Sequence, residues 1–183
     1  QGGFLMDRYK KWAEREYPVT SRILALIPAG LLIVVLIPYF LIRSGPAIDR
    51  ALGLPSFQLG LAGLIAGVIL IVVGMVYALW SIVSQMTRAS GTPLPVMPTQ
   101  KLLISPPFDQ CRNPMTLGTI LAYLGISVIL GSTSGVILAV LISTLLICYL
   151  KFIEEKELEA RFGEEYLTYK SRTPFIIPRL PKK

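Results

Sequence analysis

Histidine is absent from this chain of 183 residues, and cysteine occurs only twice. Without imidazole the protein has no histidine general base and no histidine ligand for zinc or haem. Cys111 and Cys148 are too few for a disulfide framework, and Cys148 lies inside an apolar run, where a free thiol packs as a small hydrophobe. Any chemistry therefore proceeds without imidazole, and the cysteine count leaves the redox compartment open.

Charged residues are also scarce, at 16% of the chain, whereas hydrophobic residues make up 53%. Soluble proteins contain roughly 25% charged and 45–50% apolar residues, and here the apolar excess is gathered in long runs. This composition excludes an ordinary soluble globular domain and predicts an integral membrane protein. The net charge of +7 then fits anionic lipid headgroups better than nucleic acid.

Four apolar runs predict an all-α protein with about four transmembrane helices. They are residues 23–42, 57–83, 115–130 and 135–152. A helix needs about twenty apolar residues to cross the hydrocarbon core. Pro28 and Pro38 are expected to kink the first helix, because each removes a backbone donor. Residues 43–56, which contain two glycines and two prolines, are expected to form a turn-rich link.

Small residues recur at helical spacing in three of these runs. They are Gly60, Gly63, Gly67, Gly74 and Ala78 in the second run, Gly118, Ala122 and Gly125 in the third, and Gly135, Ala139 and Ser143 in the fourth. Such stripes let helices approach closely, and the stripe of the second run would serve a dimer as well as an intramolecular contact. The third and fourth runs are separated by four residues only, so we expect an antiparallel hairpin.

The segment from residue 84 to residue 114 is expected to be the longest irregular part of the chain. Six prolines interrupt it, and loops longer than about 12–15 residues are usually functional or disordered. Beyond Phe152 the helical period continues, and one helix is expected to run on until Thr173-Pro174.

Basic residues are distributed unevenly between the segments that flank the runs. The two termini and the loop at 84–114 together hold sixteen Lys and Arg residues, whereas the two intervening segments hold two. The positive-inside rule then predicts that both termini and this loop face the cytoplasm. We expect a multi-pass protein of a prokaryotic cytoplasmic membrane. The stretch from Phe4 to Tyr17 is either an amphipathic helix along the inner interface or a disordered tail.

Two groups of polar residues lie where the apolar runs meet water. Arg112 and Asn113 precede the third helix, whose N-terminal amides suit a carboxylate or phosphate, although Arg112 could equally be an interfacial snorkelling residue. Glu154 shares a helix face with apolar residues, so a bound cation or Arg112 is expected as its partner. Glu155 has Lys151 one turn back, and an ordinary exposed ion pair is expected there.

Two segments carry a family resemblance. Residues 101–118, KLLISPPFDQCRNPMTLG, and residues 154–178, EEKELEARFGEEYLTYKSRTPFIIP, lie on either side of the expected hairpin. Together they resemble the C-terminal region of the isoprenylcysteine carboxyl methyltransferase and phospholipid methyltransferase families. The matching positions are Pro107, Phe108, Arg112, Pro114, Met115, Leu117 and Gly118, then Glu154, Glu155, Leu158, Phe162, Gly163, Tyr166 and Tyr169.

The chain departs from the family pattern at three positions. The family glycine is Pro106, the motif histidine is Asn113 and the motif tyrosine is Thr116. An asparagine can donate and accept hydrogen bonds but cannot take up a proton at neutral pH. A binding role for Asn113 is therefore open, and a role as a base is not.

The resemblance implies an enzyme, a membrane methyltransferase that uses S-adenosylmethionine on a lipophilic acceptor. The acceptor would be a prenylcysteine carboxylate, a phospholipid amine or a small thiol. Residues 1–22 would be a cytoplasmic segment, 23–83 two transmembrane helices, and 84–183 the catalytic region. The implied cofactor site comprises Leu103, Ile104, Phe108, Arg112, Asn113, Pro114, Met115, Glu154, Glu155, Tyr166 and Tyr169.

Within that implied site Arg112 and Glu154 are the candidate catalytic residues, and no metal is expected. Glu154 would face the sulfonium or amino group of the cofactor, Arg112 would bind the cofactor or orient an anionic acceptor, and Tyr166 and Tyr169 would cover the pocket. Two alternatives remain open. One is a reductase dependent on a reduced nicotinamide dinucleotide phosphate, since membrane sterol reductases have a similar C-terminal segment. The other is a non-catalytic membrane protein that retains the scaffold.

Overall fold

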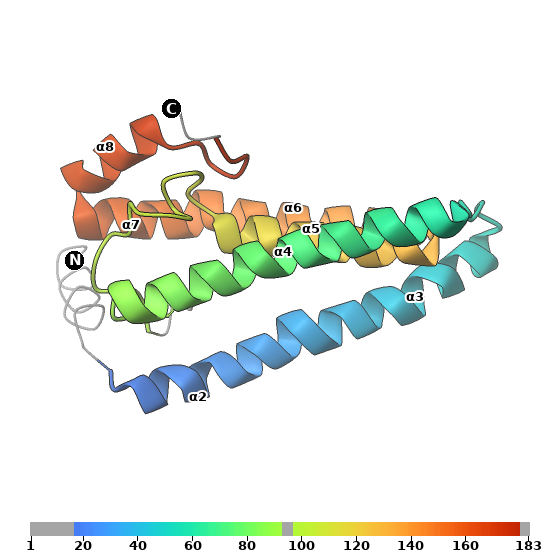
Figure 1. The fold of residues 1–183 in the computed structure, drawn as a ribbon, viewed down its shortest axis with the longest axis horizontal. Helices are drawn as coiled ribbons and strands as arrows, with labels where there is room; N and C mark the ends of the chain where they lie inside the picture. Colours follow the sequence, from blue (N-terminus) through green and yellow to red (C-terminus); the bar gives the residue numbers. More distant parts are fainter. Residues whose placement is uncertain (1–16, 93–96, 180–183) are drawn as a thin grey trace, which may run out of the picture.

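The structure is a computed structural model that describes residues 17–92 and 97–179. Long helices run side by side as a bundle, and a short helical cap lies across one end near the C-terminus (Figure 1). The all-α prediction is confirmed within these residues. The amphipathic helix considered for the stretch before Tyr17 lies outside the described residues.

The first long helical stretch is continuous from Val19 to Leu52. It consists of α2 (Val19–Gly30), a π-helical segment (Leu31–Leu36) and α3 (Ile37–Leu52). The π-helical segment lies between the two prolines that were expected to kink this helix, where Pro38 lacks the N–H that an α-helix requires. The carbonyl of Ile33 in this segment accepts a hydrogen bond of 2.8 Å from the Tyr123 hydroxyl.

The expected link at 43–56 is wrong in its first part, because α3 continues through Gly45 and Pro46 to Leu52. A Cβ atom on Gly45 would lie 3.0 Å from Cα of Gly135 in the fourth run. Gly45 therefore allows the close approach of α3 to the fourth run. The helix ends only at Gly53, whose φ of 63° is the left-handed conformation that glycine adopts without strain.

The second and third runs form α4 (Gly60–Arg88) and α5 (Pro114–Leu130), which pack along the small-residue stripes. A Cβ on Gly118 would lie 2.3 Å from the Gly74 carbonyl oxygen, and one on Gly125 would lie 2.6 Å from that of Gly67. The prediction of close helix packing is therefore confirmed for these glycine pairs. Because α4 extends to Arg88, the irregular segment begins at Ala89 rather than at residue 84.

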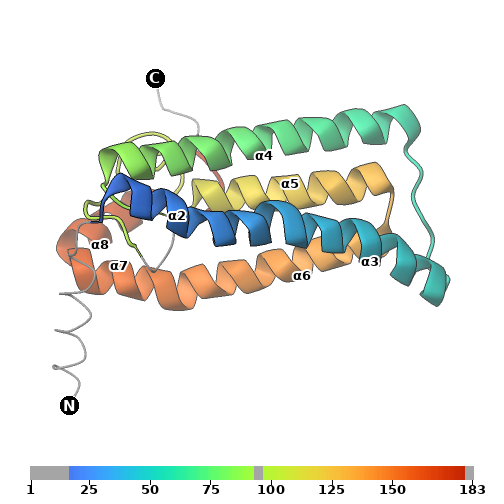
Figure 2. The same cartoon turned by 90° about the horizontal axis from the view of Figure 1, so that it is seen from below.

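The expected hairpin is formed by α5 and α6 (Thr133–Tyr149), which lie antiparallel in the bundle (Figure 2). Ser132 caps α6 by accepting a hydrogen bond from the Gly135 N–H. Asp49 of α3 joins this turn, because its carboxylate accepts hydrogen bonds from Ser132 Oγ and the Ser134 N–H at 2.6 and 2.8 Å. The far end of the bundle is thereby tied together through one buried side chain.

At the other end α6 passes through a π-helical segment (Leu150–Glu154) into α7 (Glu155–Phe162). The expectation of one helix up to Thr173 is wrong. Gly163 has φ 53° and ψ −128°, and the chain turns there into a separate helix, α8 (Glu164–Arg172). The turn lets α8 fold back across the end of the bundle (Figure 1).

Three helical stretches are long and apolar enough to cross a membrane, namely Val19–Leu52, Gly60–Arg88 and Thr133–Phe162. The fourth apolar helix, α5, has 17 residues, near the lower limit of roughly 17–25 for a spanning helix. The protein is thus a multi-span membrane protein, in agreement with the prediction of about four transmembrane helices.

Candidate functional site

A cavity of about 370 Å³ lies at the capped end of the bundle, between α5, the passage from α6 into α7, and α8. Its deep end reaches the membrane-spanning helices at Ile33, Thr119 and Leu146. Its outer end reaches the end of α4 and the loop that follows, at Gln85, Thr99 and Leu102. The site therefore joins the bilayer region of the protein to the loop end.

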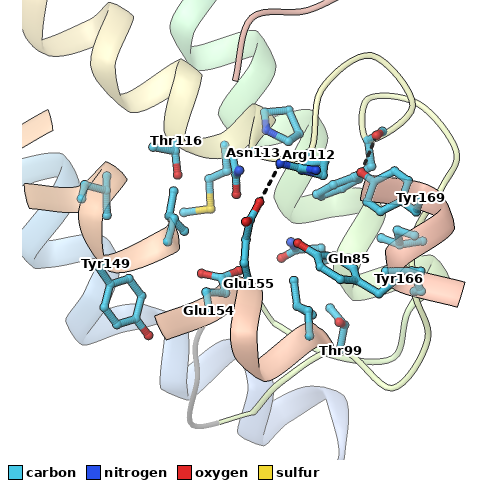
Figure 3. A pocket seen from close by; sticks show the side chains of 18 of the residues that line it. Gln85, Thr99, Arg112, Asn113, Thr116, Tyr149, Glu154, Glu155, Tyr166 and Tyr169 are labelled. Atoms are coloured by element: carbon cyan, nitrogen blue, oxygen red, sulfur yellow. Dashed lines mark hydrogen bonds and ion pairs between the residues drawn. The ribbon is translucent and has the colours of Figure 1, made fainter. Parts of the chain in front are cut away.

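Arg112 and Glu155 form an ion pair in the cavity wall (Figure 3). Arg112 Nη2 lies 2.6 Å from Glu155 Oε1, and the two side chains are only 7% and 5% exposed. The ammonium groups of Lys151 and Lys170 each lie 3.0 Å from Glu155 Oε2. Glu155 is thus the buried centre of a cluster of three cations.

This arrangement corrects the sequence-based expectation for the two glutamates. The pair of Lys151 with Glu155 is confirmed, but Glu155 is buried, and it is Glu155 rather than Glu154 that binds Arg112. The physical reason is the π-helical turn just before Glu155. Because π-helical bonds run from residue i to i+5, this turn shifts the helix face by about one residue relative to an α-helix.

Glu154 also lines the cavity, on the side of Tyr149 in Figure 3. Among the described residues its carboxylate has no hydrogen bond and no ion pair. An unpaired carboxylate in a largely apolar surrounding is costly unless a cation or hydrogen-bond donor satisfies it. Of the two partners expected for Glu154, Arg112 is taken by Glu155, and a bound cation remains.

The end of α8 and the segment after it bind the loop before α5 and hold Arg112 and Asn113 in place. The Arg112 N–H donates to the Pro174 carbonyl at 2.9 Å, and Arg112 Nη1 donates to the Lys170 carbonyl at 2.8 Å. Asn113 Nδ2 donates to the Phe175 carbonyl at 2.9 Å. The side chain at the motif histidine position therefore has its donor engaged by the backbone.

Tyr166 and Tyr169 of α8 form part of the cavity wall and are almost completely buried. The Tyr169 hydroxyl donates to the Phe108 carbonyl at 2.6 Å, which joins α8 to the loop. Burial raises the pKa of both phenols far above the usual value, so both remain protonated donors at neutral pH.

Ten of the eleven residues named for the implied cofactor site line this one cavity. They are Leu103, Phe108, Arg112, Asn113, Pro114, Met115, Glu154, Glu155, Tyr166 and Tyr169. Ile104 does not, because its side chain points outward, is 47% exposed and borders a separate surface depression with Thr168 of α8.

Several polar cavity residues were not assigned to the site from the sequence. They are Gln85, Thr99, Thr119 and Tyr149, together with Thr116, which stands at the motif tyrosine position. Gln85 lies near the end of α4, where a polar residue after a long apolar run is itself a signal of function. Thr99, Thr119 and Tyr149 come from positions with no motif, and only the fold brings them to the cavity.

The cavity offers a specific set of unsatisfied groups to a ligand. Arg112 Nε and Gln85 Oε1 are buried without a hydrogen-bond partner in the described structure. The Glu154 carboxylate forms no ion pair among the described residues. The remaining wall is largely apolar, and the volume is within the range of roughly 300–1,000 Å³ typical of small-molecule sites. The site fits a molecule that combines an apolar part with both a cationic and an anionic group.

Comparison with known proteins gives a match to a protein family. The family model described as phospholipid methyltransferase matches residues 62–165. This region begins in α4, which the motif resemblance did not include, and ends at the start of α8. No curated protein and no solved structure matches the chain.

Proposed function

Because this chain belongs to the phospholipid methyltransferase family, we propose that it transfers a methyl group from S-adenosylmethionine to a lipophilic acceptor that enters the cavity from the bilayer. Family membership implies a membrane methyltransferase that uses this cofactor. The observation that carries the finer proposal is the cavity itself, which combines an unpaired carboxylate, an unsatisfied guanidinium N–H and an apolar deep end.

The unsatisfied groups of the cavity match the polar groups of the cofactor. The Glu154 carboxylate, which has no partner in the described structure, would hold the sulfonium or the ammonium group. Arg112 Nε would donate to the cofactor carboxylate. Leu103, Met115 and Leu158 supply apolar wall for the nucleoside part.

The protein residues would act mainly by positioning. Glu155 and the Lys170 carbonyl hold the Arg112 guanidinium in a single orientation. Tyr166 and Tyr169, which are almost completely buried in the cavity wall, would limit the access of water to it. When bound, S-adenosylmethionine supplies an electrophilic methyl group, so alignment of the acceptor is the main task left to the protein. The absence of imidazole is compatible with this chemistry.

The deep end of the cavity would take the acceptor. Ile33 and Leu146 lie on membrane-spanning helices, and both line this end. A molecule with a long apolar part can reach this position from the hydrocarbon region without crossing the loop end. A prenylcysteine carboxylate, a phospholipid amine and a small thiol are the acceptors to compare.

We further propose that the capped end of the bundle faces the cytoplasm, as the distribution of basic residues predicts. Lys101→Cys and Ser56→Cys place a thiol in the exposed loop at this end and in the link between α3 and α4 at the other. In intact cells an impermeant maleimide should label Ser56→Cys and leave Lys101→Cys unlabelled until the membrane is opened. The reverse pattern would invert the topology.

The experiment that tests the proposed function is ligand stabilisation of the detergent-solubilised protein, followed by methyl transfer. A ligand at ~100 times its dissociation constant adds about 2.7 kcal/mol of stability if it binds only the folded state. S-Adenosylmethionine should raise the melting temperature, and the reduced nicotinamide dinucleotide phosphate should not. Transfer of a labelled methyl group to one class of lipid extract would then identify the acceptor.

Glu164→Gln serves as a control variant in this assay, because Glu164 is an exposed carboxylate on α8 outside the cavity. This variant should respond to S-adenosylmethionine as the wild type does. Stabilisation by the nicotinamide alone would instead favour a reductase, and no response to either ligand would favour a non-catalytic scaffold.

A further inference from the structure

The end of α4 contributes one polar side chain to the cavity that no motif assigns, Gln85. Its Oε1 atom is buried and has no hydrogen-bond partner in the described part of the chain. A buried carbonyl oxygen without a donor is unfavourable, and such groups in native proteins usually have a partner. Because this oxygen belongs to a cavity-lining residue, a bound ligand can supply the missing donor.

The surroundings of Gln85 differ from those of the charged residues of the site. The Gln100 N–H donates to the Ala89 carbonyl at 2.7 Å, which places this loop against the end of α4, one turn beyond Gln85. Arg161 of α7 donates to the Thr99 carbonyl, so α7 closes the same side. In Figure 3 Gln85 lies toward Tyr166 and Thr99, whereas Glu154 lies toward Tyr149.

This separation indicates which part of a ligand each residue meets. Glu154 and Arg112 are ionisable and suit the ionic groups of the cofactor, whereas the amide oxygen of Gln85 is a neutral acceptor and suits a neutral N–H donor. The cavity wall also contains Leu102, Leu158 and the Tyr166 ring, which suit a flat apolar ring. A purine with an exocyclic amino group has both features.

We propose that Gln85 recognises the amino group of the adenine ring and thereby sets the base specificity of the site. This inference rests on the proposed function, since it takes the ligand to be an adenosyl cofactor. Gln85 is then a specificity-determining residue for the nucleoside, separate from the residues that hold the ionic groups.

The test compares two ligands by calorimetric binding to the purified full chain. One is S-adenosylhomocysteine, and the other is its analogue with hydrogen in place of the 6-amino group. The analogue with a 6-oxo group is avoided, because a glutamine amide can turn and donate to that oxygen. The wild type should bind the amino ligand about tenfold more tightly than the 6-hydrogen analogue, which corresponds to ~1.4 kcal/mol.

Three variants sharpen the comparison. Gln85→Leu removes the acceptor and should bind both ligands equally. Gln85→Glu keeps an acceptor at the same place and should keep the preference for the amino ligand, which covers the case in which the leucine variant fails to fold. Gln58→Leu changes an exposed glutamine at the opposite end of the bundle and should behave as wild type.

The outcomes separate this inference from the proposed function. If the wild type binds both ligands equally tightly, or if Gln85→Leu keeps the tenfold preference, the assignment of Gln85 is overturned while the methyltransferase proposal stands. If the wild type binds neither ligand, the proposed function itself is overturned, and the assignment fails with it.

Discussion

The contact between α4 and α5 and the capped end of the bundle are built from opposite kinds of residue. Along the contact, glycines bring the two backbones so close that a single Cβ on Gly74 would lie 2.4 Å from the Gly118 carbonyl oxygen. At the capped end the same helices border a cavity whose wall holds charged side chains. One region has no space for an added methyl group, and the other encloses about 370 Å³.

The difference follows from the solvent around each region. Within the hydrocarbon layer apolar burial gives no preference for helix over lipid, so association depends on close van der Waals packing. Near the interface, charges can be kept if they pair, and the Arg112–Glu155 cluster does so. The glycine contact therefore stabilises the fold. At the cavity end the paired carboxylate of Glu155 stabilises the fold, and the unpaired carboxylate of Glu154 is left for a ligand.

The largest loss of stability is expected for Glu155→Gln, because this change leaves the Arg112 guanidinium buried without its counterion. Breaking a buried ion pair by removing one partner typically costs ~3–5 kcal/mol. The variant should lose stability of that order in thermal or denaturant unfolding in detergent. Its control is Glu159→Gln, because Glu159 pairs with Lys170 but is 35% exposed, where a pair contributes only ~0–1 kcal/mol. Equal losses in the two variants would contradict the buried cluster.

A smaller loss of stability is expected for Gly118→Ala. The added Cβ would lie 2.3 Å from the Gly74 carbonyl oxygen and 2.8 Å from the Ala78 nitrogen, so backbone must move. Overpacking of this kind typically costs ~1–3 kcal/mol. Gly30→Ala is the matched control, because a Cβ at Gly30 has nothing within 4 Å. If both alanine variants unfold at the same temperature, α4 and α5 do not pack at the observed distance.

The helices and the contact between α4 and α5 could be predicted from the sequence. Lengths of apolar runs give the helices, since the bilayer fixes how many residues a span needs, and small residues at helical spacing give the α4–α5 contact. The break at Gly163 was missed because the helical period continues on both sides of it. A glycine inside a helical pattern can indicate such a break. Here Gly163 adopts a φ of 53°, which ends the helix.

Only those residues of the candidate site that belong to a sequence motif could be predicted. Arg112 and Glu155 were both identified, yet their pairing was not, because the π-helical turn at Leu150–Glu154 has no signature in apolar periodicity. Ile33 was missed for another reason. It lies on a helix remote in sequence from the motif segments, and only the packing of the bundle brings it to the cavity.

The central claim is that Glu154 serves the ligand whereas Glu155 serves the fold, and Glu154→Gln tests it most directly. A charge-assisted hydrogen bond contributes ~1.5–3 kcal/mol, and each ~1.4 kcal/mol is tenfold in affinity. Calorimetry with S-adenosylmethionine should therefore show affinity reduced by roughly ten- to a hundredfold, while the melting temperature of the variant without ligand stays close to that of the wild type. Unchanged affinity in Glu154→Gln, or a loss of stability as large as that of Glu155→Gln, would contradict the account.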